Sequence, residues 1–174
     1  MSDAAAWNAL GPTIPIAVNL SAPSLMDQSL PQRVTSLLAE YQIAAHDLTI
    51  EITEDVVIAD LEQARNVLDR LHEAGVRIAI DDFGSGYGSM AYLQALPVND
   101  IKIDRQFIAP MVSDPRAAAI VKSTIELANS LQLAVTAEGV EDEATANKLK
   151  QFGCHFVQGY YFSRPVSAAV IRSA

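Results

Sequence analysis

Residues 77–88 read RIAIDDFGSGYG, and this stretch indicates how the chain folds. An apolar run ends in two acidic residues, Asp81 and Asp82, and a glycine-rich segment follows. Nearly continuous apolar runs are typical of parallel strands that are buried on both faces. Carboxylates at the carboxyl end of such a strand lie where a β/α barrel carries its active site. The stretch therefore predicts a buried strand that delivers acidic groups to a site.

Five further apolar runs with acidic or amide residues at their ends accompany this one. The first run covers residues 77–83, and the others cover residues 14–20, 48–54, 100–104, 134–140 and 156–162. Segments with apolar residues near helical spacing lie between them, at 30–41, 61–74, 90–96, 115–130 and 142–152. Alternating strands and helices indicate a parallel sheet with helices outside it. We predict an α/β fold, an incomplete TIM-like barrel with about six parallel strands. The runs IAVNL, LTIEI and RIAI are expected to be buried on both faces.

Composition restricts the functions that this chain can have. Its 174 residues are 50% hydrophobic, which is enough for one domain with a real core. The net charge of -9 repels nucleic-acid backbones, so we expect no binding to DNA or RNA. Cys154 is the only cysteine, which excludes an internal disulfide. No apolar stretch approaches the roughly 20 residues of a membrane span, and no signal-peptide pattern begins the chain, so we expect a cytoplasmic domain.

Oxygen-bearing residues at strand ends indicate a divalent-metal site. Ligands from several strand ends suit Mg²⁺ or Mn²⁺, and an aspartate pair can serve two metals. The alternative for Asp81 and Asp82 is that they only begin a turn. Acidic residues at other strand ends favour the metal site. The candidate metal ligands are Asn19, Glu51, Asp81 and Asp82.

Candidate catalytic residues stand at the ends of two later strands. Lys102, inside the apolar strand 100–104, either faces solvent on an edge strand or points into the barrel mouth, where carboxylates would pair with it. Glu138 would act as metal ligand or general base. Glu141 either belongs to the site or is a first-turn helix residue near the positive end of a helix dipole.

Further residues are candidates for holding the glycine-rich loop or contacting a ligand. Glu54 would hold the loop through a hydroxyl of Ser85 or Ser89. Gln158 and Tyr160 either touch a planar base or a phosphate, or are structural. The three histidines have no metal-ligand spacing, and we interpret them as surface or structural residues.

Six motifs together resemble the EAL-domain phosphodiesterases. In order they are VNLSAPSL, LTIEITE, IAIDDFGSGYGSM, LPVNDIKIDRQFI, AVTAEGVE and GCHFVQGYYFSRP. They extend from about Trp7 to Pro165, almost the whole chain, in the order and spacing of the family. The resemblance implies a modified barrel fold that hydrolyses the bacterial messenger cyclic di-GMP to linear pGpG with Mg²⁺ or Mn²⁺.

The resemblance also implies roles for the metal and catalytic residues. Lys102 resembles the lysine that contacts the catalytic water, and Glu138 matches the proposed base or ligand. Asp82 resembles the ligand of the second metal. The residues that resemble ligands of the first metal are Asn19, Glu51 and Asp81.

A second group resembles the loop-positioning and substrate-binding residues of the family. Glu54 resembles the glutamate that steadies the flexible loop beginning at Asp81. Ser85 replaces the usual threonine of that loop and keeps a hydroxyl. Glu141 and Gln158 match further site residues.

The sequence departs from the family at its N-terminal side. The family begins with two strands, and the second carries the Glu-Ala-Leu signature, whose glutamate is a metal ligand; a nearby arginine contacts the substrate phosphate. Neither motif occurs here. Residues 2–8 instead resemble the end of a helix. We therefore expect residues 1–174 to be a single truncated EAL domain, weakly active or inactive, that self-associates through exposed strand edges.

Two alternative functions remain open on the sequence. The first is a non-catalytic module, either a receptor for cyclic di-GMP or an interaction fragment. The second is a different metal-dependent barrel enzyme that acts on sugar phosphates, which nothing outside the family pattern supports.

Overall fold

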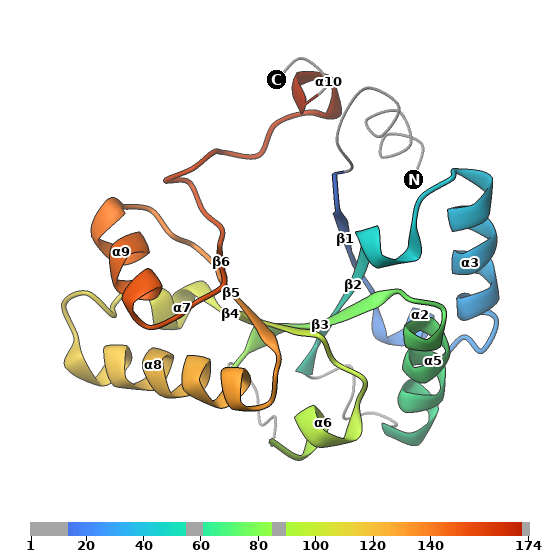
Figure 1. Cartoon of the computed structure of the whole chain (residues 1–174), viewed down its shortest axis with the longest axis horizontal. Helices are drawn as coiled ribbons and strands as arrows, with labels where there is room; N and C mark the ends of the chain where they lie inside the picture. The colour runs from blue at the N-terminus through green and yellow to red at the C-terminus, as the bar shows by residue number, and fades with distance from the viewer. Residues whose placement is uncertain (1–13, 55–60, 85–89, 172–174) are drawn as a thin grey trace.

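The computed structural model describes residues 14–54, 61–84 and 90–171. Within these ranges, six strands form one sheet in the order β1-β2-β3-β4-β5-β6, and each neighbouring pair is parallel (Figure 1). The strands are β1 (Ile16–Asn19), β2 (Leu48–Thr53), β3 (Arg77–Phe83), β4 (Asp100–Ile103), β5 (Ala134–Ala137) and β6 (Phe156–Val157). This arrangement confirms the predicted α/β fold with six parallel strands in an open barrel.

Helices follow the strands, as the apolar spacing predicts. They are α2 (Ala22–Leu25), α3 (Leu30–Glu40), the short 3₁₀ helix η1 (Ala45–Asp47), α5 (Leu61–Glu73), α6 (Met90–Ala95), α7 (Arg105–Ile108), α8 (Pro115–Ser130), α9 (Glu143–Gln151) and α10 (Ala168–Ile171). Gly75 and Gly153 follow α5 and α9 with φ angles of 89° and 81°, the left-handed conformation that ends a helix. The helix end expected at 2–8 lies outside the described residues.

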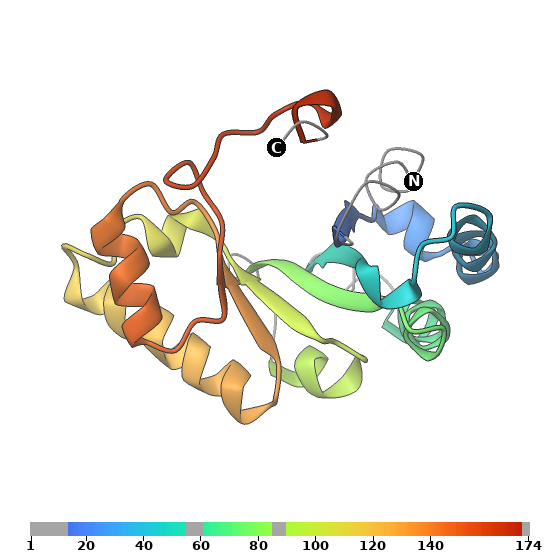
Figure 2. The same cartoon turned by 45° about the horizontal axis from the view of Figure 1, so that its top comes forward.

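The core lies between the sheet and the helices on its outer face. Alternate residues of a strand point to opposite faces, so Ile78 and Ile80 of β3 face outward while Ala79 faces inward. Two clusters of buried apolar residues fill the outer side, one among β2, α3 and α5 and the other among β4, β5 and α8. Figure 2 shows these helices along one side of the curved sheet, which leaves its inner side open.

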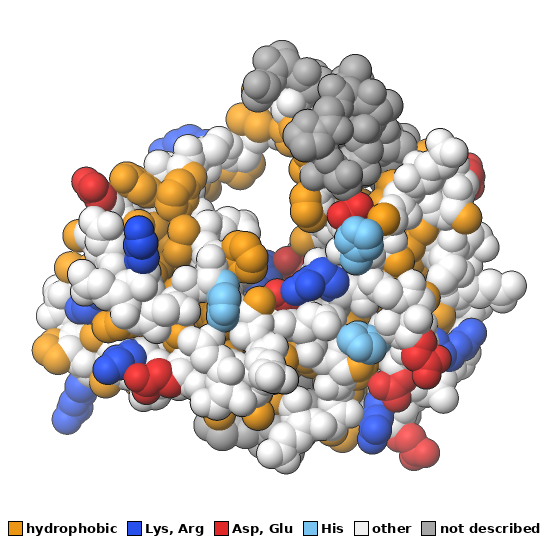
Figure 3. Space-filling model, viewed as in Figure 1, with side chains coloured by type: hydrophobic (Ala, Val, Ile, Leu, Met, Phe, Trp, Pro, Cys, Tyr) orange, Lys and Arg blue, Asp and Glu red, His pale blue; other side chains and the backbone are white. Residues whose placement is uncertain are grey.

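The inner face of the sheet carries polar residues around a hollow. A cavity of about 570 Å³ lies on this face. Its lining includes Glu51, Lys102 and Gln158, together with small residues such as Ala79 and Thr136. Basic and acidic side chains show at the floor of the hollow in Figure 3. The strands therefore separate two environments, an apolar outer core and a polar inner cavity.

The two edge strands differ from the sequence-based expectation. β1 was expected to be buried on both faces, but most of it is exposed and Val18 keeps 47% of its surface accessible. The expectation is wrong because β1 lies at the edge of the sheet, with β2 as its one strand neighbour among the described residues.

The last strand is much shorter than the predicted run 156–162. The chain leaves the sheet after Val157 and folds around Val140 instead. The Val140 N–H donates to the Gln158 carbonyl at 3.0 Å, and the Tyr161 N–H donates to the Val140 carbonyl at 3.0 Å. These bonds occupy the backbone groups that an extended strand would offer to a neighbour, so the apolar residues that follow are exposed.

No helix in the part of the chain that the structure describes is both long and apolar enough to cross a membrane.

Candidate active site

Lys102 lies at the centre of the acidic residues that the strand ends bring together. Its Nζ is 2.7 Å from Glu138 Oε1, 3.0 Å from Glu51 Oε2 and 3.0 Å from Asp81 Oδ1. The three carboxylates come from β2, β3 and the residue after β5, while Lys102 belongs to β4 between them. The side chain of Lys102 is only 9% exposed. The alternative of a solvated lysine on an edge strand is therefore wrong.

The environment of Lys102 keeps its ammonium group charged. Burial lowers the pKa of Lys102, but hydrogen bonds with Glu138, Asp81 and Glu51 outweigh burial and raise the pKa above its ordinary value. One ammonium group faces three carboxylates, so the cluster keeps an excess of negative charge. A further cation would be attracted to this end of the sheet.

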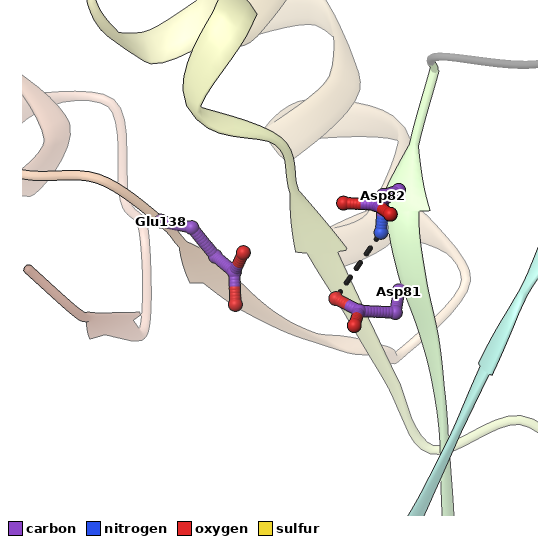
Figure 4. Close-up of side chains that lie close together, drawn as sticks. All are labelled: Asp81, Asp82 and Glu138. Carbon is purple, nitrogen blue, oxygen red and sulfur yellow. Dashed lines mark hydrogen bonds between the residues drawn. The ribbon is translucent and has the colours of Figure 1, made fainter. Parts of the chain in front are cut away.

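Asp81 and Asp82 present their carboxylates in different directions from adjacent positions of β3. The pairing of β3 with β4 shifts register between Ile80 and Phe83, and Asp82 has a φ of 54°. The Asp82 N–H donates to Asp81 Oδ1 at 3.2 Å (Figure 4). In that view Glu138, which follows β5, points toward the pair across the intervening strand β4. One oxygen of each of Asp81, Asp82 and Glu138 lies within 4.8 Å of the others.

The donor set of this cluster fits a divalent cation. Carboxylate oxygens are hard ligands of the kind that Mg²⁺ and Mn²⁺ take in proteins. Asp81, Asp82 and Glu138 are all partly exposed, so a cation could reach them.

The surroundings of Asp82 favour the protonated form of its carboxyl group. Burial is the largest cause that raises the pKa of Asp82. A hydrogen bond with the Asp104 side chain and the charges of Asp81, Asp104 and Glu138 raise it further. Asp82 therefore holds a proton more tightly than an ordinary aspartate does.

Asp104 is a residue of this site to which sequence reasoning gave no role. Its side chain contacts Asp82, and its Oδ1 accepts a hydrogen bond from the Gln106 N–H at 2.7 Å at the start of α7. Its position two residues after Lys102, directly at the end of a strand, is the signal that could have indicated it.

Glu54 holds the start of the glycine-rich loop. It is 6% exposed, and its Oε1 accepts a hydrogen bond from the Gly84 N–H at 2.8 Å. The contact that the structure gives is thus to the backbone of the loop. The predicted contact with Ser85 or Ser89 falls outside the described residues and stays a prediction.

Three candidates near the two edges of the sheet are exposed and are not among the residues that form ion pairs with Lys102. Asn19 pairs in register with Glu51 but is exposed. Gln158 lines the cavity and is also exposed. Tyr160 is 52% exposed, and the Arg164 guanidinium lies 4.6 Å from its ring centroid.

Glu141 forms an ion pair rather than serving as a first-turn helix residue. Its Oε1 is 2.8 Å from Nη2 of Arg105. Helix α9 begins at Glu143 behind its N-cap Asp142, so Glu141 precedes the helix and the first-turn alternative is wrong.

Comparisons with known proteins show the family and the fold to which this chain is similar. Residues 1–165 match the EAL domain family. The cyclic di-GMP phosphodiesterase PA2567 of Pseudomonas aeruginosa is 37% identical over 166 residues, which are 95% of this chain and 28% of that protein. The solved structure of the PaMucR phosphodiesterase in complex with c-di-GMP is 37% identical with a TM-score of 0.90, over 97% of this chain and 69% of that one.

A metal-containing structure is also similar. The calcium and cyclic di-GMP complex of Klebsiella pneumoniae BlrP1 is 32% identical with a TM-score of 0.81, over 94% of this chain and 42% of that one. The chain spans 22% to 28% of the length of the first five curated relatives that it matches.

The chain belongs to the EAL-domain family of cyclic di-GMP phosphodiesterases.

Proposed function

We propose that this chain is a phosphodiesterase domain that hydrolyses cyclic di-GMP to linear pGpG. The observation that supports the proposal best is the buried Lys102 ammonium among Glu51, Asp81 and Glu138. This arrangement provides both a metal-binding carboxylate set and a fixed positive charge beside it. PA2567 carries the name of a cyclic di-GMP phosphodiesterase, which supports the same substrate.

Four residues would hold Mg²⁺ or Mn²⁺ in this proposal. Asn19, Glu51 and Asp81 would hold a first ion, and Asp82 would hold a second. When bound, such ions polarise a phosphoryl oxygen and neutralise charge on the attacking and leaving oxygens of an in-line displacement.

Lys102 would orient the attacking water, and Glu138 would accept its proton. The raised pKa of Lys102 keeps its ammonium group charged, with three N–H donors that face Glu51, Asp81 and Glu138. A water that takes the place of one of these carboxylates at the ammonium group would receive a hydrogen bond and a fixed orientation. Glu138 would accept the proton of that water as general base. Their contact at 2.7 Å supports this pair of roles.

The remaining candidates would act on the substrate side. Gln158 is exposed and lines the cavity, and Tyr160 is exposed two residues later, so both could contact a guanine base or a phosphate. Glu141 would be a further binding residue. Glu54 would fix the loop that carries Ser85, through the Gly84 contact.

We also propose that the 174-residue chain hydrolyses the substrate slowly. It contains no Glu-Ala-Leu signature, and so lacks the glutamate ligand and the arginine that the family pattern provides. Loss of one charged ligand commonly costs a few kcal/mol, and about 1.4 kcal/mol is tenfold in rate. Two such losses would reduce the rate by several orders of magnitude. A cyclic di-GMP receptor without catalysis is the second candidate.

Two assays separate these functions. Calorimetric titration with cyclic di-GMP, with and without Mn²⁺, measures binding, and product analysis measures pGpG. Slow pGpG formation supports the enzyme, binding without product supports the receptor, and absence of both contradicts both. A chain extended upstream with two strands and the signature is the reference for the rate. A rate within about tenfold of that reference would contradict the proposed loss of activity.

The metal assignment has its own test. An Asp81→Asn, Asp82→Asn double variant should bind Mn²⁺ much more weakly than the parent chain in a calorimetric titration. A matched control carries Asp69→Asn and Glu73→Gln, both on the exposed face of α5. Equal affinity of the double variant and the parent would overturn the assignment.

We further propose that residues 1–174 form one domain that is cytoplasmic and pairs with a second copy through its sheet edges. The support is that β1 and β6 each have a single strand neighbour within the described ranges, and that Val18 and Phe156 are 47% and 59% exposed. Strand edges with exposed apolar residues are templates for pairing. Light scattering at high micromolar concentration should show a dimer or larger species, and a monodisperse monomer would contradict this.

A further inference from the structure

Arg105 connects the ends of β4 and β5 beside the candidate site. It is the first residue of α7 and stands three residues after Lys102. Its guanidinium Nη2 lies 2.8 Å from Glu141 Oε1, on the segment that follows β5. One side chain thus reaches from the strand end that carries Lys102 to the turn that carries Glu138.

The stem of Arg105 also packs on this turn. Gly139 has a φ of 67°, and a Cβ built there would lie 2.6 Å from Cβ and 2.8 Å from Cδ of Arg105. A methyl group therefore has no room between them. The aliphatic part of Arg105 lies directly on Gly139 while its charged end holds Glu141. Arg105 therefore contacts the turn of residues 138–141 at two residues, Gly139 and Glu141. Glu138 directly precedes Gly139 in the chain.

Two backbone hydrogen bonds also hold the turn of residues 138–141. The Glu138 N–H donates to the Ile103 carbonyl at 3.1 Å, and the Val140 N–H donates to the Gln158 carbonyl at 3.0 Å. These bonds tie the turn to β4 on one side and to the segment after β6 on the other. The Glu138 carboxylate then meets Lys102 at 2.7 Å.

We propose that Arg105 is a positioning residue that holds the 138–141 turn and thereby fixes the Glu138 carboxylate beside Lys102. The assignment of a role in the reaction rests on the proposed function, whereas the hold on the turn does not. The side chains of Arg105 and Glu141 are 60% and 49% exposed, and an ion pair this exposed contributes little to overall stability. Loss of Arg105 should therefore disturb the turn while leaving the fold intact.

Hydrogen exchange on the metal-free chain tests the hold directly. In Arg105→Ala, the amides of the peptide covering 138–141 should exchange about tenfold faster than in the parent, because their two hydrogen bonds open more often. Arg105→Met, which keeps the stem, should give an intermediate rate. Arg105→Lys, which keeps stem and charge, should recover most of the protection. Amides of α8 should be unchanged in all three variants. Unchanged exchange at 138–141 in Arg105→Ala would overturn the inference.

Mn²⁺ affinity and kinetics test the consequence for the site. Glu138 lies within 4.8 Å of the proposed metal ligands Asp81 and Asp82 and adds negative charge beside them, so we expect Mn²⁺ affinity to fall severalfold in Arg105→Ala. We expect kcat for pGpG formation to fall about tenfold, with KM within about twofold. The urea midpoint should stay at the parent value, and Lys122→Ala, an exposed cation on α8, should change none of these quantities. Faster exchange with unchanged kcat in an active chain would overturn the positioning role.

The failure of the proposed function would look different. If the parent makes no pGpG, the phosphodiesterase assignment fails. The exchange rates and Mn²⁺ affinities then test, without any activity, whether Arg105 positions Glu138.

Discussion

The middle strands and the edge strands of this sheet carry candidate residues of the same kind, but the structure treats them differently. Glu51, Asp81 and Lys102 on β2, β3 and β4 are buried or partly buried, and the two carboxylates each contact Lys102. Asn19 on β1 and Gln158 after β6 are exposed. In both regions a polar residue follows an apolar run. The local sequence pattern is therefore the same in the two regions, but the burial and the contacts of the polar residues differ.

The difference shows that a polar side chain at a strand end is buried among charged partners where the strand has neighbours on both sides. Between two parallel strands, a polar side chain on the inner face meets side chains from each neighbour, and Lys102 meets three carboxylates in this way. At an edge, one side stays open to water. Ion pairs around Lys102 therefore fix the polar side chains in the middle of the sheet, whereas the polar residues Asn19 and Gln158 at the edges face water.

Substitution of Lys102 should have the largest effect, because it breaks the middle region. Lys102→Met leaves Glu51, Asp81 and Glu138 close together without their cation, which should lower the free energy of unfolding by about 3–5 kcal/mol. Urea denaturation of the metal-free chain measures this. Mn²⁺ should restore more stability to the variant than it adds to the parent. Lys122→Met on exposed α8 should change stability by less than about 0.5 kcal/mol, and equal effects of the two variants would contradict the comparison.

Gly159→Ala tests how the edge at β6 is attached. A Cβ at Gly159 would lie 2.6 Å from the carbonyl carbon of Val140 and closer still to its nitrogen and oxygen, and Val140 is completely buried. Since backbone cannot move aside, we expect a loss of about 2–3 kcal/mol in thermal or urea unfolding. The control Gly153→Ala has space, with Asn129 Nδ2 at 3.6 Å, but a φ of 81°, and should cost about 1 kcal/mol. A larger loss in the control would mean that β6 is not held at this point.

Asp82→Asn sharpens the charge argument for the middle strands. The pKa of Asp82 is raised by burial and by Asp104 and Asp81, so the native state binds the proton more tightly than the unfolded state. The parent therefore loses stability as pH rises from the ordinary aspartate pKa through the raised one. Asn removes this loss, and the metal-free variant should melt a few degrees higher than the parent at neutral pH. The difference should vanish below about pH 4. Equal melting at neutral pH, or a lower value for the variant, would contradict the raised pKa.

Phe156→Ser should have the smallest effect on folding. The side chain is 59% exposed at the edge, so the free energy of unfolding should change by less than about 0.5 kcal/mol. The same chain should self-associate less, as measured by light scattering. The contrasting variant Ile101→Ala, at a completely buried position of β4, should cost about 2–5 kcal/mol. A large loss of stability from Phe156→Ser would show that this edge is covered within a single chain.

Much of the fold and of the candidate site could be predicted because it depends on local pattern. Apolar runs placed the strands, and helical spacing placed α3, α5 and α8. Because the carboxyl ends of parallel strands meet at one edge of a sheet, Glu51, Asp81, Lys102 and Glu138 could be assigned to one place before any geometry was known.

The sequence by itself thus determined the order of elements, the parallel sheet and the residue types at its carboxyl edge. Only the tertiary structure decided which of those residues converge. Three features depend on contacts between segments distant in the chain: the burial of Lys102 among three carboxylates, the contact of Asp82 with Asp104, and the grip of Arg105 on the 138–141 turn. The exposure of β1 and the early end of β6 follow from missing neighbours within the described sheet. Local pattern sets where a side chain points along its own strand, but burial and charge pairing depend on what the other strands place beside it.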